Sequence, residues 1–260
     1  MSQRLVFIGA GNLATRLAIE LKNKGYLIQQ VYSRSESSAV LLSQKLQTYY
    51  TTSPENISPD ADIYFVALKD SVIEQVLSQV TFANKLVVHC SGSLPLSVLE
   101  KYSKNTGVFY PLQTFSKHQS VDFKRIPVFV EASSTENENI LMQLAVKISD
   151  EVGLLNSEKR LFLHIAAVFA CNFVNHFYTI ASDLLESKNI SFKVLHPLIQ
   201  ETVLKVMNMK PQNAQTGPAM RFDQNVISAH LNALGSFPEF RELYRSISES
   251  IHNYHKPIHQ

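Results

Sequence analysis

The chain is organised around one stretch near its start, Arg4-Leu5-Val6-Phe7-Ile8-Gly9-Ala10-Gly11-Asn12-Leu13-Ala14-Thr15-Arg16-Leu17-Ala18. An apolar run of strand length leads into Gly9-x-Gly11-x-x-Ala14, and helical apolar spacing begins at Leu13. The order strand, glycine turn and helix is the context in which this pattern predicts a dinucleotide site. Gly9 permits a tight turn, Gly11 leaves room for a pyrophosphate, and Ala14 lets the helix pack closely on the strand. An ordinary turn rich in small residues is the competing interpretation.

The phosphates of the nucleotide are expected at the main chain of Gly9, Ala10, Gly11, Asn12 and Leu13. Free backbone N–H groups and the positive end of the helix dipole point at a ligand placed there. This part of the site depends on backbone geometry and charge, so it indicates a phosphate-bearing cofactor without saying which one.

The end of the second predicted strand indicates which dinucleotide is bound. The strand at 26–33 is predicted to lead into Ser33-Arg34-Ser35, at the point where an NAD site would carry Asp or Glu for the ribose hydroxyls. A guanidinium with neighbouring hydroxyls suits a 2′-phosphate, because Arg pairs with phosphate through charge-assisted hydrogen bonds. We therefore expect NADP(H) rather than NAD(H), and the missing acid also argues against FAD and S-adenosylmethionine. The alternative for Arg34 is a solvated turn residue.

The composition narrows the class of protein. The chain has 260 residues, enough for two domains, and a formal net charge of +2 with no block of like charge. We expect neither nucleic-acid nor membrane binding, and the longest apolar stretch, 165–174, is interrupted by Asn172. Two cysteines far apart favour a reducing, cytoplasmic environment over a disulfide framework. No secretion leader is visible in the sequence.

Alternating strands and helices continue to about residue 154. Apolar strands are predicted at 62–68, 86–89, 107–110 and 127–131, and a helix at 136–151 closes the pattern. Ligands of open α/β sheets sit beyond the carboxyl ends of strands. Leu68, Lys69, Asp70 and Ser91 are therefore expected to contact the cofactor, with turn chemistry as the alternative for Ser91. Ser71 is expected to cap a helix at 72–80. Gln113, in the loop after the strand at 107–110, is expected to face a substrate.

The sequence changes character after residue 154. Apolar residues recur at helical spacing from Leu161 to Leu184, which predicts one helix of about 28 residues. Further helices are predicted at 192–209, 224–234 and from Pro238 to before Pro257. The expected fold class is thus α/β, with a doubly wound, mainly parallel sheet over 1–154 and an all-helical domain over 155–260. The apolar face of so long a helix is expected to be buried, either by the first domain or by a second subunit.

Several motifs resemble a known family. The first-turn pattern and Ser33-Arg34-Ser35 resemble the NADP oxidoreductase domain shared by pyrroline-5-carboxylate reductase and F420-dependent NADP reductase. Further motifs are similar to the bacterial family that joins a Rossmann-like domain to a DUF2520 domain. These motifs are His89-Cys90-Ser91-Gly92-Ser93, Tyr110-Pro111-Leu112-Gln113-Thr114-Phe115, Ala166-Ala167-Val168 through Asn172-Phe173, and Thr216-Gly217-Pro218. The resemblance covers nearly the whole chain.

The resemblance implies an N-terminal Rossmann domain and a helical C-terminal domain like those of 6-phosphogluconate dehydrogenase relatives. It also implies a homodimer formed through the helical domain and an active site in the cleft between domains. One departure matters for the chemistry. The β-hydroxyacid dehydrogenase relatives carry a Lys-x-x-x-Asn pair on the long helix, and here Val168 stands four residues before Asn172. Their lysine acid–base chemistry therefore does not transfer.

Three residues are the candidates for chemistry. His164 is the candidate proton donor, because the pKa of histidine lies near neutrality, and it precedes Asn172 by two helical turns. Asn172 must find a partner in an apolar helix, either substrate or neighbouring backbone. Gln113 is the third candidate. A packed, hydrogen-bonded side chain is the alternative for His164.

We expect no metal site, because His252, His255 and His259 lie around Pro257 at a chain end without a carboxylate or thiolate.

The sequence thus predicts an NADP(H)-dependent oxidoreductase that acts on a small C=N or C=O substrate. The alternative is an NADP(H)-binding regulatory or scaffold protein without turnover, which the missing lysine favours. A third reading is a structural homodimer with a vestigial nucleotide site.

Overall fold

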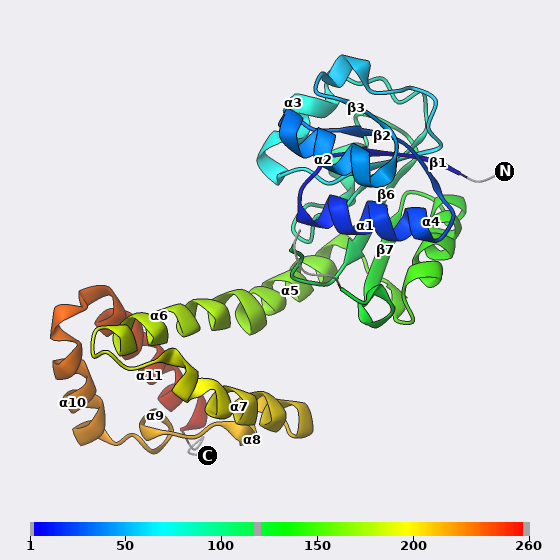
Figure 1. The fold of residues 1–260 in the computed structure, drawn as a ribbon. Helices are drawn as coiled ribbons and strands as arrows, with labels where there is room; N and C mark the ends of the chain where they lie inside the picture. The colour runs from blue at the N-terminus through cyan, green and yellow to red at the C-terminus, as the bar shows by residue number, and fades with distance from the viewer. Residues whose placement is uncertain (1–2, 117–120, 257–260) are drawn as a thin grey trace. The chain divides into compact units, whose positions relative to one another are not determined.

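A computed structural model describes residues 3–116 and 121–256. The chain divides into two compact units, Met1–Cys171 and Asn172–Gln260 (Figure 1). The predicted boundary at residue 154 falls at the end of the last strand. The first unit continues beyond it to Cys171, because the helix that follows buries Arg160 against the sheet domain.

The first unit is built on an eight-stranded sheet in the described part of the chain, with the strand order β3-β2-β1-β4-β5-β6-β7-β8. All neighbouring strands are parallel except β6 and β7, which pair antiparallel. The bounds are β1 (Arg4–Ile8), β2 (Leu27–Tyr32), β3 (Tyr49–Thr51), β4 (Ile63–Val66), β5 (Leu86–His89), β6 (Thr106–Pro111), β7 (Val128–Ala132) and β8 (Val152–Leu154). This order, with the chain reversing direction beside β1, confirms the predicted doubly wound, mainly parallel Rossmann sheet.

Helices pack on both faces of the sheet (Figure 1). The side chains of β1 point alternately to these two faces. Leu5 and Phe7 join a core with apolar residues of α1, α2 and α4, whereas Val6 and Ile8 join a second core with residues of α3. These four β1 side chains are fully buried, because a parallel strand covered on both faces has no solvent side. The bounds are α1 (Asn12–Asn23), α2 (Glu36–Leu46), α3 (Ile73–Leu77), α4 (Thr135–Ile148) and α5 (Ser157–Ala167).

Short 3-10 turns complete the connections. They are η1 (Pro54–Asn56), η2 (Asp70–Val72), η3 (Leu96–Leu99), η4 (Phe123–Arg125), η6 (Phe192–Leu195) and η7 (Leu234–Ser236). The expectation that Ser71 caps a helix at 72–80 is wrong. The backbone already turns at η2, so Ser71 lies within that turn, and α3 begins at Ile73 without a side-chain cap.

The predicted long helix exists, with an interruption that the apolar spacing does not indicate. From Ser157 to Glu186 the chain is helical over 30 residues, but Val168–Phe173 (η5) forms a π-helical segment between α5 and α6 (Val174–Glu186). π-helical segments are uncommon and are found frequently at functional sites. Asn172 lies in this segment.

The second unit is all-helical in its described residues, as predicted. Its remaining helices are α7 (His196–Asn208), α8 (Pro211–Ala214), α9 (Pro218–Arg221), α10 (Gln224–Ala233) and α11 (Pro238–His255). Ser191 caps η6, which runs into α7, and the Asp223 carboxylate accepts the N–H of Val226 to cap α10. Between 172 and 256 only Ala219, Ile227 and Ser248 are buried. The unit therefore has little core of its own.

The segment Ser157–Glu186 is also long and apolar enough to cross a membrane, judged by length and composition alone. None of its most apolar window is buried within the chain. The apolar run at 165–174, on which the expectation of no membrane binding rested, is only the middle part of this segment. A single helix of this kind is weak evidence, because a helix that packs in a protein core passes the same test.

Candidate functional site

The glycine turn after β1 is shaped by a close approach of the neighbouring strand. Gly9 has φ +127°, and its N–H donates to the carbonyl oxygen of Tyr32 on β2 at 2.8 Å. A Cβ at this position would lie 2.3 Å from the carbonyl oxygen of Ala67, the residue after β4. Only glycine tolerates both the dihedral angle and the contact. The ends of β1, β2 and β4 therefore converge on this turn.

Gly11 has a different reason to lack a side chain. It precedes α1 with φ −74°, and a Cβ added to it would meet nothing within 4 Å. No side chain caps the helix, and no acidic residue occupies its first turn. The first backbone N–H groups of α1 therefore face open space, which suits an anion at the positive end of the helix dipole. The protein's own packing leaves the Gly11 position free, and a pyrophosphate fits there.

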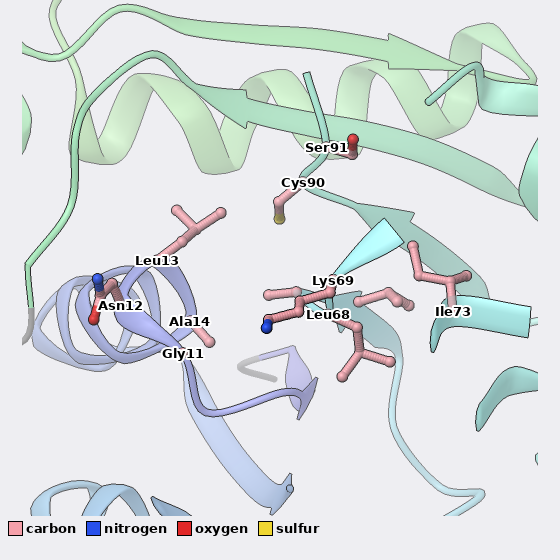
Figure 2. Close-up of a pocket in the computed structure, with 11 residues that line it drawn as sticks. Gly11, Asn12, Leu13, Ala14, Leu68, Lys69, Ile73, Cys90 and Ser91 are labelled. Atoms are coloured by element: carbon pink, nitrogen blue, oxygen red, sulfur yellow. The ribbon is translucent and has the colours of Figure 1, made fainter. Parts of the chain in front are cut away.

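Two adjoining cavities lie at this end of the sheet. Gly11, Ala67, Leu68 and Lys69 line both of them. The smaller cavity, of about 220 Å³, is shown in Figure 2 and is lined by Gly11, Asn12, Leu13, Ala14, Val66, Ala67, Leu68, Lys69, Ile73, Cys90 and Ser91. The larger cavity, of about 480 Å³, is lined by Gly9, Ala10, Gly11, Tyr32, Ser33, Arg34, Ser35, Ser38, Thr52, Pro54, Ala67, Leu68, Lys69, Val72, Gln75, Val76 and Gln79. Their position beside β1 and β4 is the switch point of the sheet.

The larger cavity brings together the residues predicted to choose the cofactor. Ser33 is buried, Arg34 and Ser35 are exposed, and the Ser35 hydroxyl caps α2 by accepting the N–H of Ser38. Within the described residues the Arg34 guanidinium makes no hydrogen bond or ion pair with a carboxylate. Burial raises the pKa of Tyr32 at the cavity wall, and the charge of Arg34 opposes this shift. A free cation and hydroxyl groups suit a phosphate.

The smaller cavity ends at the loop after β5. Cys90 is buried, and desolvation raises the pKa of its thiol to about 12, so the thiol is neutral at physiological pH. Ser91 lines the cavity and donates to Asp70 Oδ2 at 3.2 Å, and Ser93 donates to the same oxygen at 2.8 Å. Asp70 lines neither cavity, unlike the other predicted cofactor residues. It links the loop after β4 to the loop after β5.

A buried polar network lies behind this loop. Arg160, only 1% exposed, forms an ion pair with Glu131 on β7 and donates to the Leu94 carbonyl oxygen at 2.5 Å. Ser157 donates to the same carboxylate at 2.8 Å, and its oxygen accepts the N–H of Leu96 at 2.9 Å. The first turn of α5 is therefore attached to the chain that follows Ser91.

His89 supports the same loop from inside the sheet. It is fully buried, and its Nδ1 accepts the N–H of Ser91 at 3.2 Å. Desolvation lowers its pKa to about 4, and the charge of Arg160 acts in the same direction. The ring is therefore neutral at physiological pH, and it acts as a hydrogen-bond acceptor that shapes the loop rather than as a proton donor.

The predicted proton donor lies against this loop. His164 on α5 is half-buried, and its Nδ1 lies 3.0 Å from the Tyr110 hydroxyl on β6. Burial raises the pKa of Tyr110, and the charge of Arg160 opposes this shift, so the phenol keeps its proton near neutrality. The His164 ring packs on Gly92, next to Ser91 of the smaller cavity.

The other two predicted catalytic residues have no established connection to the cavities. The Gln113 side-chain oxygen accepts the N–H of Thr114 at 2.7 Å, and Gln113 lines neither cavity. Asn172 lies in the second unit and is exposed there. Asn12, predicted to contact the cofactor, uses its side chain to donate to the Phe115 carbonyl oxygen at 2.9 Å. Only its main chain is left for a phosphate.

Sequence reasoning missed several residues. Ser38, Thr52, Gln75 and Gln79 line the larger cavity although they lie on a helix or in loops without a motif. The buried Arg160 could have been found, because it stands four residues before His164 and so shares its helix face. Nothing in the sequence indicates that Tyr110 contacts His164.

The described residues contain no group of three or more His, Cys, Asp or Glu side chains able to hold a metal. His252 instead stacks on Phe222 with ring centroids 3.6 Å apart. His259, the last of the three predicted non-ligands, lies outside the described residues.

Comparison with known proteins gives two family matches. Residues 4–92 match the family described as NADP oxidoreductase, coenzyme F420-dependent, and residues 126–251 match DUF2520, a domain of unknown function. A Bacteroides fragilis protein, named provisionally as an NADP oxidoreductase, is 49% identical over 97% of this chain and 98% of its own, with a TM-score of 0.92. This chain belongs to the two-domain NADP oxidoreductase and DUF2520 family.

More distant structures share the fold of this NADP oxidoreductase family member. An imine reductase from Myxococcus stipitatus in complex with NADP+ is 16% identical, covering 96% of this chain and 92% of its own, with a TM-score of 0.65. A pyrroline-5-carboxylate reductase from Coxiella burnetii is 17% identical, covering 98% of both chains, with a TM-score of 0.57. No protein of curated function matches the chain.

Proposed function

We propose that the protein is an NADP(H)-dependent oxidoreductase that transfers hydride to or from a small C=N or C=O substrate. The observation that carries the cofactor choice is Arg34, which lines the larger cavity with no carboxylate partner among the described residues. Family membership supports an oxidoreductase, and the distant relatives named as imine and pyrroline-5-carboxylate reductases support a C=N substrate first.

The cradle at the end of β1 fits such a cofactor. The N–H groups at the start of α1 would hold the pyrophosphate, with Lys69 as a nearby cation that lines both cavities. Arg34, Ser33 and Ser35 would hold the 2′-phosphate. When bound, NADPH supplies the hydride, and the protein supplies orientation and a proton.

The protein's own residues account for the proton. His164 is the proposed donor, because an imidazole can give a proton to a substrate atom and this ring packs on Gly92, beside Ser91 of the smaller cavity. Asn172 and Gln113 remain proposed substrate contacts. The buried Cys90 thiol stays protonated and is not a nucleophile in this scheme.

Calorimetry and a turnover assay test the proposal. Wild-type protein should bind NADPH more tightly than NADH. Arg34→Ala should weaken NADPH by about 10- to 100-fold and leave NADH nearly unchanged, since a hydrogen bond to a charged group contributes about 1.5–3 kcal/mol. Arg125→Ala removes another exposed arginine that lines neither cavity, and it should change neither affinity. A panel of cyclic imines and small ketones then tests NADPH oxidation.

A protein that binds NADPH but oxidises it with no imine or ketone would instead be a regulatory or scaffold protein. The absence of a lysine four residues before Asn172 is the observation that favours this reading. Absence of any heat of binding for NADPH and NADP+ would overturn both readings and leave a structural role.

We also propose a homodimer formed through the helical domain. Large apolar side chains are exposed along α7, among them Leu198 at 62% and Met207 at 78%. Exposed apolar patches of this kind mark interaction sites. A cytoplasmic location is proposed as well, because Cys90 and Cys171 are both free thiols.

A further inference from the structure

Tyr110 and His164 form a hydrogen-bonded pair that the choice of cofactor does not explain. Tyr110, near the end of β6, is only 7% exposed, and its hydroxyl lies 3.0 Å from Nδ1 of His164 on α5. The two rings meet edge to face, with centroids 6.1 Å apart. A buried tyrosine hydroxyl ordinarily finds a hydrogen-bond partner, and here that partner is the candidate acid.

A second contact fixes the same edge of the histidine ring. A Cβ added to Gly92 would lie 2.6 Å from both Cγ and Nδ1 of His164. The Cγ–Nδ1 edge therefore rests on the main chain of Gly92 and points at Tyr110. Nε2 lies at the opposite edge of the imidazole ring, away from both contacts, and His164 keeps part of its surface exposed.

We propose that Tyr110 is a positioning residue that engages Nδ1 of His164 and so makes Nε2 the atom that transfers the proton. This inference rests on the proposed reduction of a C=N or C=O bond. The partner at one ring nitrogen of a histidine determines which nitrogen is free to exchange a proton. Gly92 contributes by allowing the ring to approach the loop closely enough for this hydrogen bond.

The proton balance is simple. The Nε2–H bond of the imidazolium breaks, its electron pair stays on Nε2, and a new N–H or O–H bond forms on the substrate. The carbon of the same bond receives the hydride of NADPH, so the substrate is reduced by two electrons while NADPH is oxidised. The imidazole regains its proton from water.

Tyr110 itself is not the proton source. Burial raises the pKa of its phenol, with the charge of Arg160 opposing, so the hydroxyl persists and can donate to or accept from Nδ1. The other ionisable groups of the network behind the Ser91 loop are Arg160, one turn earlier on α5, its partner Glu131, His89, and Asp70 beyond Ser91 and Ser93. None of these groups forms a hydrogen bond with His164 in the described part of the chain.

Nuclear magnetic resonance on the full-length protein tests the pair without a substrate. With 15N-labelled histidine, long-range 1H–15N spectra report the protonation of each ring nitrogen of His164, which a His164→Asn sample assigns. We expect one neutral tautomer in the wild type, both with and without NADP+. In Tyr110→Phe, the neutral ring should populate both tautomers, and its titration midpoint should move. A mixed tautomer in the wild type, or unchanged spectra in Tyr110→Phe, would overturn the proposal.

Tyr64→Phe is the matched control. It also removes one hydroxyl from a buried tyrosine of the sheet, where the phenol donates to the Ser58 carbonyl oxygen at 2.8 Å. The His164 spectra should remain those of the wild type in this variant. A change of equal size in Tyr64→Phe would mean that the effect is a general loosening of the sheet and would overturn the positioning role.

Kinetics separate this inference from the proposed function. With an imine or ketone that the protein reduces, Tyr110→Phe should lower kcat by about tenfold or more and shift the pH profile of kcat/KM. The KM for NADPH should stay within about twofold, because Tyr110 lines neither cavity. Turnover with an unaltered pH profile in Tyr110→Phe would refute the positioning role of Tyr110 without affecting the proposed oxidoreductase function. A protein that does not bind NADPH would refute the proposed function. The tautomer measurement would still test the Tyr110–His164 pair, because it needs neither cofactor nor substrate.

Discussion

At the scale of single residues, two glycines of one motif have opposite physical requirements. Gly9 has a positive φ and faces the Ala67 carbonyl oxygen, whereas Gly11 has an ordinary φ and faces open space. The first glycine is required by the fold itself. The second leaves room that the folded chain does not use, which agrees with the proposal that a ligand phosphate lies there.

We expect Gly9→Ala and Gly11→Ala to separate stability from binding. Gly9→Ala should lower the free energy of unfolding by about 1–3 kcal/mol or more, through overpacking and a left-handed dihedral angle. Gly11→Ala should stay within about 1 kcal/mol of the wild type yet lose most NADPH affinity, because the new methyl group occupies the pyrophosphate position. Urea unfolding and calorimetry measure the two quantities. Equal loss of stability in both variants would contradict this assignment.

The buried His89 makes stability depend on pH. Its pKa is about 4 in the folded protein and near 6.5 in the unfolded chain, so the unfolded state binds more protons between these values. Stability should be complete above pH 6.5 and fall as the pH drops toward 4, by up to about 3 kcal/mol at roughly 1.4 kcal/mol per pKa unit. Urea midpoints measured from pH 7 to pH 4.5 test this.

His89→Asn is the control for that titration, since its side-chain oxygen can still accept the N–H of Ser91 and has no proton to gain. The variant should be less stable at pH 7, but its stability should fall less steeply with acid than that of the wild type. Parallel curves for the two proteins would show that other groups dominate the acid dependence.

At the scale of elements, α5 carries a buried anchor and the proposed proton donor on one face. Asn156 caps it by accepting the N–H of Lys159, and Arg160 and His164 follow at a spacing of four residues, which places both side chains on one side. Arg160 attaches the first turn to Glu131 and to the Leu94 carbonyl oxygen. The proposed donor is thus held one turn beyond a buried ion pair.

Arg160→Met should therefore be strongly destabilising. It leaves the Glu131 carboxylate without its cation, and breaking a buried pair costs about 3–5 kcal/mol. The double variant Arg160→Met/Glu131→Leu should recover part of this loss, because no buried charge is left unpaired. Lys124→Met is the control: it breaks an exposed ion pair with Asp150 and should cost less than about 1 kcal/mol. Similar unfolding curves for Arg160→Met and Lys124→Met would refute the anchoring role.

At the scale of the whole molecule, the two units differ in how they bury apolar surface. The sheet unit has a core on each face, whereas buried residues between 172 and 256 are confined to Ala219, Ile227 and Ser248. A helical unit with so few buried side chains gains little hydrophobic stabilisation by itself. This imbalance is the physical basis for the proposed homodimer.

Leu198→Asp on α7 tests the homodimer. We expect the wild type to elute as a dimer in size-exclusion chromatography with light scattering. The aspartate should shift the population toward monomer, because a charge in an apolar interface is costly to desolvate. Gln200→Asp adds the same charge in place of an exposed polar residue on the same helix and should remain dimeric. A monomeric wild-type protein would refute the proposal directly.

The sequence by itself determined the order of elements and the location of the cradle. Both follow from local rules: the buried strands appear as apolar runs, and the turn after β1 needs Gly9 whatever surrounds it. The location of Arg34 was also predictable from the sequence, because this residue lies two positions after the end of β2. These features depend on neighbours in the chain.

Only the tertiary structure decided what lies behind the Ser91 loop. The Tyr110–His164 and Glu131–Arg160 pairs join residues separated by 54 and 29 positions, and no local pattern encodes such contacts. No local pattern shows either that Asp70 lines neither cavity. Its side chain instead accepts hydrogen bonds from Ser91 and Ser93, where the loops after β4 and β5 meet. Local propensity placed each residue on its strand, helix or loop, and the packing of α5 against the sheet domain then determined which side chains could meet.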